Sequence, residues 1–230
     1  MKKIMLFVLA ATLGATCGWA QAQEKFEKVR VYFEQNVQDK DVEVKFEATG
    51  GSAGLASMKV SAPDGRTVID FKATDSKLGM RHLVLESPEP KNDGQLQKDF
   101  PAGLYKFTGT LVGGTALLGQ ANLSHALPAP AKLIRPRSEE QNVPVKGLKA
   151  SWSAAKNLES IVVLLVQEKS GREIKVNLAG NATSFAVPDG FLQAGQEYKL
   201  EIGTVSKEGN TSYIESTFTT KGVKHEISQR

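Results

Sequence analysis

Hydrophobic residues alternate with polar residues along most of the chain. In residues 28–33, Val29, Val31 and Phe33 alternate with polar or amphipathic side chains, and residues 41–47 repeat the pattern. Such alternation turns one face of an extended segment toward a core and the other toward water, as in a strand of an antiparallel sheet. No long stretch after residue 22 has helical periodicity. The sequence therefore predicts an all-β fold.

Turn residues divide this pattern into short strands. Pro63 and Gly65 mark a hairpin, because proline presets a turn and glycine tolerates positive φ. We expect about seven strands between Val29 and Leu127. Later strands are separated by turn signals at roughly ten-residue spacing, which is typical of a β-sandwich.

A proline-rich segment, "LPAPAKLIRPRSEEQNVP" (residues 127–144), interrupts the strands. Proline cannot donate to a sheet ladder and stiffens a linker. We place a domain boundary near Pro130 and expect a short, fairly rigid joint. The predicted units are an N-terminal sandwich over 23–130, a second sandwich over 131–222 and a flexible tail over 223–230.

Two segments, "FPAGLYKFTG" (100–109) and "FLQAGQEYKLEIG" (191–203), each set Ala-Gly shortly before Tyr-Lys. A chain that crosses between the sheets of a sandwich needs a residue that tolerates unusual backbone angles, and Gly103 and Gly195 fit that need. Tyr105 and Tyr198 are then candidates for a tyrosine corner, in which the hydroxyl bonds backbone upstream. The functional alternative is a shared ligand-binding motif.

The first 22 residues have the three parts of a secretory signal. Lys2 and Lys3 precede a short apolar run, Ile4–Leu13, and Ala-Gln-Ala at 20–22 fits a cleavage site. The alternatives are a retained anchor and lipid attachment at Cys17, the single cysteine. Cleavage after residue 22 removes that cysteine, so it excludes disulfides and thiol chemistry in the remainder.

Charge and hydropathy indicate no nucleic-acid or membrane partner for the cleaved chain. The formal net charge of the whole chain is +4, and Lys2 and Lys3 account for two of those charges. The basic residues are scattered and form no stripe. No second apolar segment is long enough to span a bilayer, so we expect a periplasmic or secreted protein.

The second unit resembles a fibronectin type III domain. The matching segments are "LKASWS", with Trp152 at the core position of its strand, "LQAGQEYKL" at the corner, and "GNTSYIESTFTT" at the end. Ala194 stands where that pattern prefers proline. The resemblance covers roughly Ala131 to Thr220 and implies a sandwich with a buried Trp152.

The whole chain looks like a group of bacterial exported proteins that join such a domain to an N-terminal sandwich. The stretches "APDGRTVIDFKA", "ESPEP", "FPAGLYKFTG" and "ANLSHALP" carry this likeness. The group has no assigned activity, so the resemblance implies an immunoglobulin-like fold, twice in tandem, and an exported location, but no reaction.

Few residues suggest chemistry. His125 shares the apolar pattern of its segment, so we interpret it as a hydrogen-bonded core residue. Met80 and His82 could be soft copper ligands, but two ligands do not make a site. His225 lies in the polar tail. The sequence contains neither a Gly-x-Ser-x-Gly elbow nor a His-Glu-x-x-His motif.

Carboxylates offer a second set of candidates. Asp39, Asp41 and Glu43 are expected on one face of a strand, and Glu86 and Glu89 flank "ESPEP". A calcium site at either place needs six or more oxygens, mostly from loops. Alternating acids on a solvated strand are ordinary, so we expect no metal, no cofactor and no enzyme.

Carbohydrate-binding modules are the main alternative among β-sandwiches. They usually present flat aromatic platforms, yet Trp152 is expected in the core. Tyr32 and Tyr213 are then the aromatic candidates, at positions the sequence does not cluster. This pattern argues against a deep sugar site.

The sequence thus favours a non-enzymatic binding or scaffold protein of the bacterial cell envelope with a protein partner. Loops at the ends of sandwiches usually carry recognition. The expected contact loops are Lys207–Thr211, with Lys207, Glu208 and Asn210, and Lys91–Gln97. An edge strand that adds a partner's strand is the other expected mode.

Overall fold

The computed structural model describes residues 23–75, 77–89, 93–153 and 156–222. The predicted signal at 1–22 and the predicted tail at 223–230, with His225, lie outside these residues. Over the described residues the chain forms sixteen strands and one short helix. The prediction of a nearly all-β chain is confirmed.

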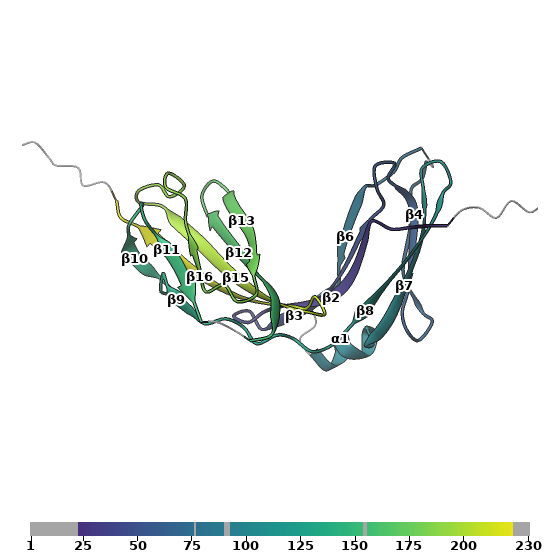
Figure 1. The fold of residues 1–230 in the computed structure, drawn as a ribbon, viewed down its shortest axis with the longest axis horizontal. Coiled ribbons are helices and arrows are strands. Elements are labelled where there is room, and N and C mark those ends of the chain that lie inside the picture. The colour runs from purple at the N-terminus through teal and green to yellow at the C-terminus, as the bar shows by residue number, and fades with distance from the viewer. Residues whose placement is uncertain (1–22, 76, 90–92, 154–155, 223–230) are drawn as a thin grey trace, which may run out of the picture.

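The first hydrophobic core lies in the lobe on the right of Figure 1, between two layers of strands. One layer is the five-stranded sheet β1-β8-β7-β4-β5, and β2, β3 and β6 form the other. The seven strands expected in this region are β2 to β8, and the additional β1 pairs with β8. The bounds are β1 (Glu24–Lys25), β2 (Lys28–Asn36), β3 (Asp41–Thr49), β4 (Leu55–Ser61), β5 (Thr67–Lys72), β6 (His82–Glu86), α1 (Asp93–Asp99), β7 (Gly103–Leu111) and β8 (Ala116–Leu123).

The second core lies in the other lobe, between the sheet β14-β11-β9 and strands β12, β13, β15 and β16. Trp152 is buried at its centre, and its ring N–H donates to the carbonyl of Ala182 at 2.8 Å. The bounds are β9 (Leu133–Arg135), β10 (Glu140–Val143), β11 (Lys149–Trp152), β12 (Leu158–Gln167), β13 (Arg172–Ala179), β14 (Ser184–Ala186), β15 (Glu197–Ser206) and β16 (Thr211–Thr220).

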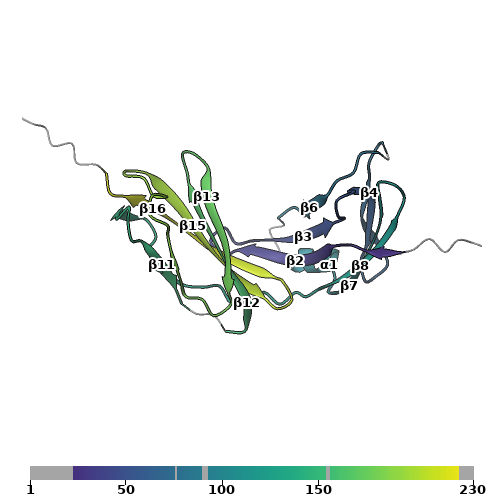
Figure 2. The same ribbon diagram turned by 45° about the horizontal axis from the view of Figure 1, so that its top comes forward.

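One sheet runs through both lobes. Strand β2 pairs in parallel with β16, from Glu34 opposite Thr211 to Asn36 opposite Tyr213. The strand order is therefore β13-β12-β15-β16-β2-β3-β6, with β10 also paired to β16. Figure 2 shows β2 and β3 reaching from their own lobe to this junction. The proline-rich segment is thus one of two connections between the lobes, and the sequence predicted only that one.

The buried side chain of Asn210 fastens this junction. Its exposed fraction is 0 %. Its amide oxygen accepts the N–H of Phe33 at 2.9 Å, and its amide nitrogen donates to the carbonyls of Ser124 at 2.8 Å and Ala126 at 2.9 Å. One side chain therefore joins β2, the segment after β8 and the β15–β16 turn. The prediction that Asn210 belongs to a partner-contacting loop is wrong, because no part of it reaches the surface.

Two hydroxyls extend the fastening along the proline-rich segment. Ser212 donates to the carbonyl of Pro128 at 2.8 Å, and Thr204 donates to that of Ala129 at 3.0 Å. Proline has no backbone N–H to donate, but its carbonyl oxygen can accept a hydrogen bond. The segment before the predicted boundary is therefore held against β15 and β16.

Both Ala-Gly-Tyr elements form turns tied by the tyrosine hydroxyl. The Tyr198 hydroxyl accepts the N–H of Gln193 at 2.8 Å, and Gly195 has a φ of 65°. The Tyr105 hydroxyl donates to the carbonyl of Pro101 at 3.1 Å, and Gly103 has a φ of 134°. Both φ values lie in the region that favours glycine. Both rings are fully buried.

Replacement of the junction amide should destabilise the whole protein. Asn210→Ala leaves one buried N–H and two carbonyls without their partner, and each such group costs about 1–3 kcal/mol. We expect urea denaturation to show a loss of about 3 kcal/mol or more. The control is Asn122→Ala, on the exposed side of β8, which should change stability by less than about 0.5 kcal/mol. Equal effects of the two variants would contradict the fastening role.

The tyrosine corner near the end of the chain gives a smaller, local effect. Tyr198→Phe keeps the buried ring but leaves the Gln193 N–H without its acceptor. The expected loss of unfolding free energy is about 1–3 kcal/mol, measured by thermal or urea denaturation. Tyr32→Phe is a suitable comparison. Tyr32 lies within strand β2 and its ring contacts Arg30, so its hydroxyl does not close a turn in the described residues. A Tyr198→Phe protein as stable as wild type would contradict the corner.

Candidate functional site

A broad groove lies between the two lobes, on the face of the eight-stranded sheet that turns away from both cores. Its cavity volume is about 1430 Å³, and residues of β13 and β6 are among those that line it. The alternation of the strands produces this surface. Along β3, for example, Val42, Val44 and Phe46 enter the core while Glu43 and Lys45 face the groove.

The groove is acidic, although the chain as a whole is basic. Eleven Asp or Glu residues line it among the described residues, against six Lys or Arg residues, an excess of 11 − 6 = 5 negative charges. The whole chain has a formal net charge of +4. A cleft lined by one sign of charge concentrates ions of the other sign. The groove therefore attracts cations.

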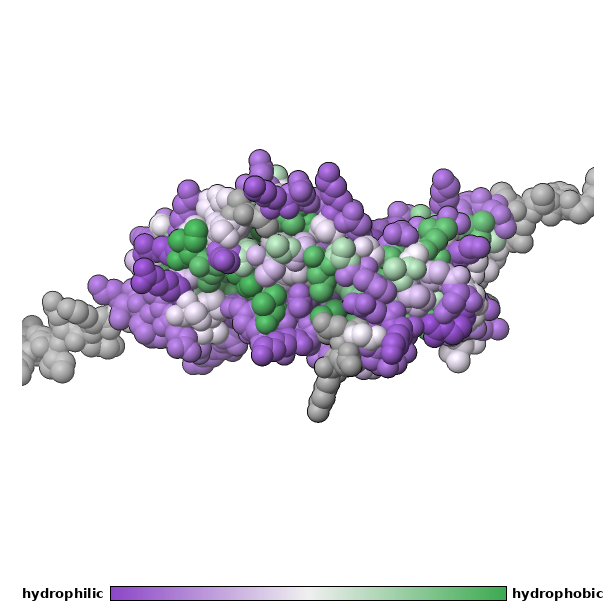
Figure 3. Space-filling view, turned by 90° about the horizontal axis from the view of Figure 1, so that it is seen from below, coloured by the Kyte–Doolittle hydropathy of each residue, from purple (hydrophilic) through white to green (hydrophobic). Residues whose placement is uncertain are grey.

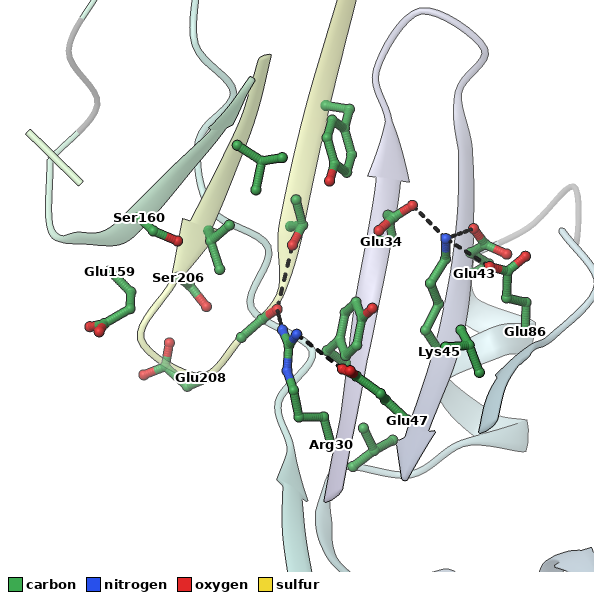
Figure 4. Close-up of a pocket in the computed structure, with 18 of the residues that line it drawn as sticks. Arg30, Glu34, Glu43, Lys45, Glu47, Glu86, Glu159, Ser160, Ser206 and Glu208 are labelled. Carbon is green, nitrogen blue, oxygen red and sulfur yellow. Dashed lines mark hydrogen bonds and ion pairs between the residues drawn. The ribbon is translucent and has the colours of Figure 1, made fainter. Parts of the chain in front are cut away.

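One lysine is shared by three carboxylates at the β2–β3–β6 end of the groove. The ammonium nitrogen of Lys45 lies 2.7 Å from Glu34, 3.1 Å from Glu43 and 3.0 Å from Glu86 (Figure 4). Burial alone would lower the pKa of Lys45, but the carboxylates outweigh it and raise that pKa. Burial also raises the pKa of Glu43 despite the lysine. The four side chains together carry two uncompensated negative charges.

A second cluster surrounds Glu47. Its carboxylate lies 2.8 Å from Lys28, 3.3 Å from Arg30 and 3.2 Å from the ring of His82. Burial by itself raises the pKa of Glu47, but these neighbours offset it and lower the pKa overall. Arg30 also donates to the carbonyl of Gly209 at 3.2 Å. The cluster thus links β2 and β3 to the β15–β16 turn (Figure 4).

The structure brings Tyr32 and Tyr213 into the same groove, although their positions in the sequence are not clustered. Burial raises the pKa of both hydroxyls. The guanidinium of Arg30 lies 4.2 Å from the centre of the Tyr32 ring. Tyr213 covers Gly203, where a Cβ would lie 2.5 Å from the ring. Each ring thus already packs against a neighbour from the chain itself.

The opposite part of the groove contains acids without an ion pair among the described residues. Glu159 and Glu208 are exposed there, beside Ser160 and Ser206 (Figure 4). Ser206 is 8 % exposed, and its hydroxyl has no hydrogen-bond partner in the described part of the chain. A buried hydroxyl without a partner is uncommon in folded proteins.

The predicted contact loops have mixed outcomes. Lys207 and Glu208 are exposed and line the groove, whereas Asn210 is buried as described above. In the second predicted loop, Lys91 and residue 92 lie outside the described residues. Residues 93–97 belong to helix α1, and Leu96 is buried in the first core. The expectation that this segment is an open loop is wrong, because its apolar residue anchors a helical turn.

The histidines are separate side chains with their own contacts. His82 lies on β6 against Glu47, as above, and Met80 next to it is exposed. His125 lies beyond the end of β8, where its ring stacks on Phe33 and donates to the carbonyl of Phe100 at 2.8 Å. Across the described residues, no group of three or more His, Cys, Asp or Glu side chains is arranged to hold a metal ion.

The carboxylates predicted to share a strand face are divided. Asp41 and Glu43 lie on β3, but Asp39 lies in the turn before it and accepts a hydrogen bond from the amide of Asn36 at 2.9 Å. The short turn ends the alternation earlier than the sequence indicated. Glu86 is held by Lys45 and Glu89 follows it at the rim of the groove.

Comparisons with known proteins report structural likeness only. No protein-family model matches the chain, and no curated protein matches it. Similar solved structures include one described as Clostridium thermocellum CbhA fibronectin(III)-like modules. Its identity to this chain is 10 % over 90 % of this chain and 98 % of that one, with a TM-score of 0.36. A two-domain fibronectin type III segment of chicken tenascin has 11 % identity over 86 % of this chain and 100 % of that one, with a TM-score of 0.33. A human collagen alpha-1(XX) fn3 domain has 20 % identity over 46 % of this chain and 94 % of that one, with a TM-score of 0.33.

The one helix of the described residues, α1, is too short and too polar to cross a membrane. Seen from below, the side away from the groove, hydrophobic residues are interspersed with hydrophilic ones (Figure 3).

The shared lysine should control a pH-dependent part of the stability. The pKa of Lys45 is higher in the folded protein than in the unfolded chain. Its contribution to the free energy of unfolding is therefore complete below the ordinary lysine pKa, and it is lost only as the pH rises through the folded-state pKa. Lys45→Met leaves three carboxylates unpaired, so the variant should lose stability as the pH rises through the carboxyl range near about 4.3.

We expect the loss at pH 7 to exceed that at pH 3 by about 1–2 kcal/mol after allowance for solvent screening. Urea denaturation at both pH values measures it. Lys175→Met, an exposed groove lysine on β13, is the matched control and should show no such difference. A pH-independent loss for Lys45→Met would contradict the charge pairing.

Proposed function

We propose that this chain is an exported, non-enzymatic binding or scaffold protein of the bacterial cell envelope. We further propose that its groove binds an extended, lysine- or arginine-rich segment of a protein partner. The observation that carries this proposal is the excess of five negative charges in a groove of a basic chain. Opposite charge across an interface speeds association and selects partners.

The form of the groove supports an extended occupant rather than a small molecule. Its residues come from strands on both sides of the junction between β2 and β16. Glu159 and Glu208 are exposed at one part of it and the Lys45 cluster lies at another. Basic side chains of a peptide can pair with these acids.

The contacts of the titratable groups in the groove and of the two described histidines support a binding role. Each perturbed pKa has a structural cause in a neighbouring charge or in burial, as for Lys45, Glu43 and Glu47. Nucleophilic catalysis needs a base held against a nucleophile and oriented by a third group. Within the described residues, the bonds of His82 and His125 go to Glu47 and to the carbonyl of Phe100.

The proposal includes the organisation inferred from the sequence. The first 22 residues serve as a cleaved signal, residues 23–130 form an N-terminal sandwich and residues 131–222 form a fibronectin type III-like sandwich. The two separate cores and the Tyr198 turn support this division. A periplasmic or secreted location follows from the signal.

Carbohydrate binding is the second candidate, because Tyr32 and Tyr213 share the groove. Sugar platforms need an open aromatic face. Arg30 and Gly203 lie against these two rings, so a basic protein segment is the better fit. A glycan array on the purified protein separates the two: strong, saturable signal favours the sugar and overturns the peptide proposal.

A direct test uses a fluorescently labelled peptide of alternating lysine and valine. We expect it to bind at low ionic strength and to weaken as salt is added, because exposed charge pairs are screened. Glu159→Gln combined with Glu208→Gln should weaken binding about threefold to tenfold, as expected for two exposed pairs. Fluorescence anisotropy measures both effects.

The control for this experiment is Glu173→Gln, which removes an exposed acid of β13 outside the groove. It should leave the affinity within about twofold, since this exposed carboxylate does not line the groove and is screened by salt. Absence of peptide binding at low salt, or equal weakening by the control, would overturn the groove as the site. Capture of an envelope protein by the wild type, but not by the double variant, would then identify the natural partner.

A further inference from the structure

Strand β6 forms an edge of the eight-stranded sheet. Over the described residues it pairs with β3 and with no second strand. The outward side is occupied only before the strand begins, where Met80 is bridged to Leu55 of β4, so the open edge is His82–Glu86. The N–H of Gly50 donates to the carbonyl of Arg81, and the N–H of Ser87 donates to that of Val44. Backbone groups of alternate residues point to opposite sides of an antiparallel strand. The backbone groups of Leu83 and Leu85 therefore face β3, as do those of Arg81 and Ser87.

The backbone groups of the intervening residues, His82, Val84 and Glu86, then face outward. An edge of this kind is a template for another strand, and proteins usually protect it with lysine, proline or a bulge. Residues 82–86, "HLVLE", contain neither lysine nor proline. The β3–β6 register is regular across all five pairs.

Exposed apolar side chains gather at the same edge. Seven large hydrophobic side chains are exposed among the described residues, and four lie between residues 78 and 85. Their exposed fractions are 62 % for Leu78, 49 % for Met80, 47 % for Val84 and 37 % for Leu85. A hydrophobic edge with open backbone groups indicates a surface that another strand covers.

We propose that the occupant is a second copy of this chain, whose β6 pairs antiparallel with the first. Centred on Val84, such a pair sets Val84 opposite Val84, His82 opposite Glu86 and Leu83 opposite Leu85. In this register each residue whose backbone faces outward lies opposite another such residue. The backbone N–H and carbonyl groups of His82, Val84 and Glu86 on each copy can therefore all form hydrogen bonds across the dimer. The register also places a carboxylate opposite each imidazole, on both sides of the two-fold axis.

This self-complementarity, with an imidazole N–H opposite a carboxylate at both ends, is what selects a second copy over an unrelated strand. An isologous two-fold contact needs a surface that is complementary to itself. The segment "HLVLE" meets this need, because an antiparallel copy of it places Glu86 opposite His82 and Val84 opposite Val84. A shift of two residues in either direction loses both His82–Glu86 pairs. Because His82, Val84 and Glu86 all line the groove, the two grooves of the dimer lie on one continuous face of the joined sheets.

The first test is sedimentation velocity over a concentration series, on the protein expressed from its complete coding sequence. We expect the mean mass to rise with concentration toward that of a dimer, since a contact through one strand is small and reversible. Val84→Pro removes an outward N–H and leaves the bonds to β3 in place. It should weaken association at least about tenfold, because two backbone bonds and the close strand approach are lost.

Asp70→Pro is the matched control. Strand β5 is the edge of the other sheet, and the bond from the N–H of Ala73 to Ala56 turns the backbone of Asp70 outward by the same alternation. The control should dimerise like wild type. Circular dichroism and thermal unfolding verify that both proline variants are folded.

An exchange of charges tests the register without proline. His82→Glu sets Glu against Glu86 of the other copy twice, and also against Glu47 of its own chain. It should weaken the dimer, and the addition of Glu86→His should restore association although the contact with Glu47 stays lost. Three results would each overturn the proposal: a monomer at every concentration, a dimer that Val84→Pro leaves unchanged, or an exchange variant that fails to recover while remaining folded.

Discussion

The side chain of Asn210 and the three-residue pairing of β2 with β16 decide how the rest of the molecule is arranged. A buried amide that uses its oxygen and both its N–H groups is specific, because displacement of either lobe leaves costly unsatisfied groups. The bonds from Asn210 span up to 177 residues of sequence, from Phe33 to the β15–β16 turn. They align the two lobes so that a single sheet crosses between them.

The groove follows from that alignment. Alternation in each strand sends one set of side chains into a core and leaves the other set outward, and the joined sheet brings the outward sets of both lobes together. The Lys45 cluster and the Glu47 cluster neutralise only part of the assembled acidity. A surface of this type is stable as folded but retains an attraction for added cations.

The strands, the turns and the buried Trp152 could be predicted from sequence because they depend on local alternation and on a few turn residues. Asn210 was misassigned, since a polar residue beside Gly209 in a turn has the same local signature whether it is buried or exposed. Asp39 and the segment 93–97 were misassigned for a related reason: a turn or a single helical turn is too short to alter periodicity. The clustering of Tyr32 with Tyr213 depends on the pairing of β2 with β16, for which no local pattern exists.

The sequence by itself determined the nearly all-β character, the spacing of the strands and the two Ala-Gly-Tyr turns, because each depends on residues close together in the chain. Only the tertiary structure decided that one sheet crosses both lobes, that eleven acids meet in one groove, and that β6 remains an open edge. Those features depend on contacts between residues far apart in sequence, and a strand that alternates well can pair with many partners. The buried amide at the junction selects among them.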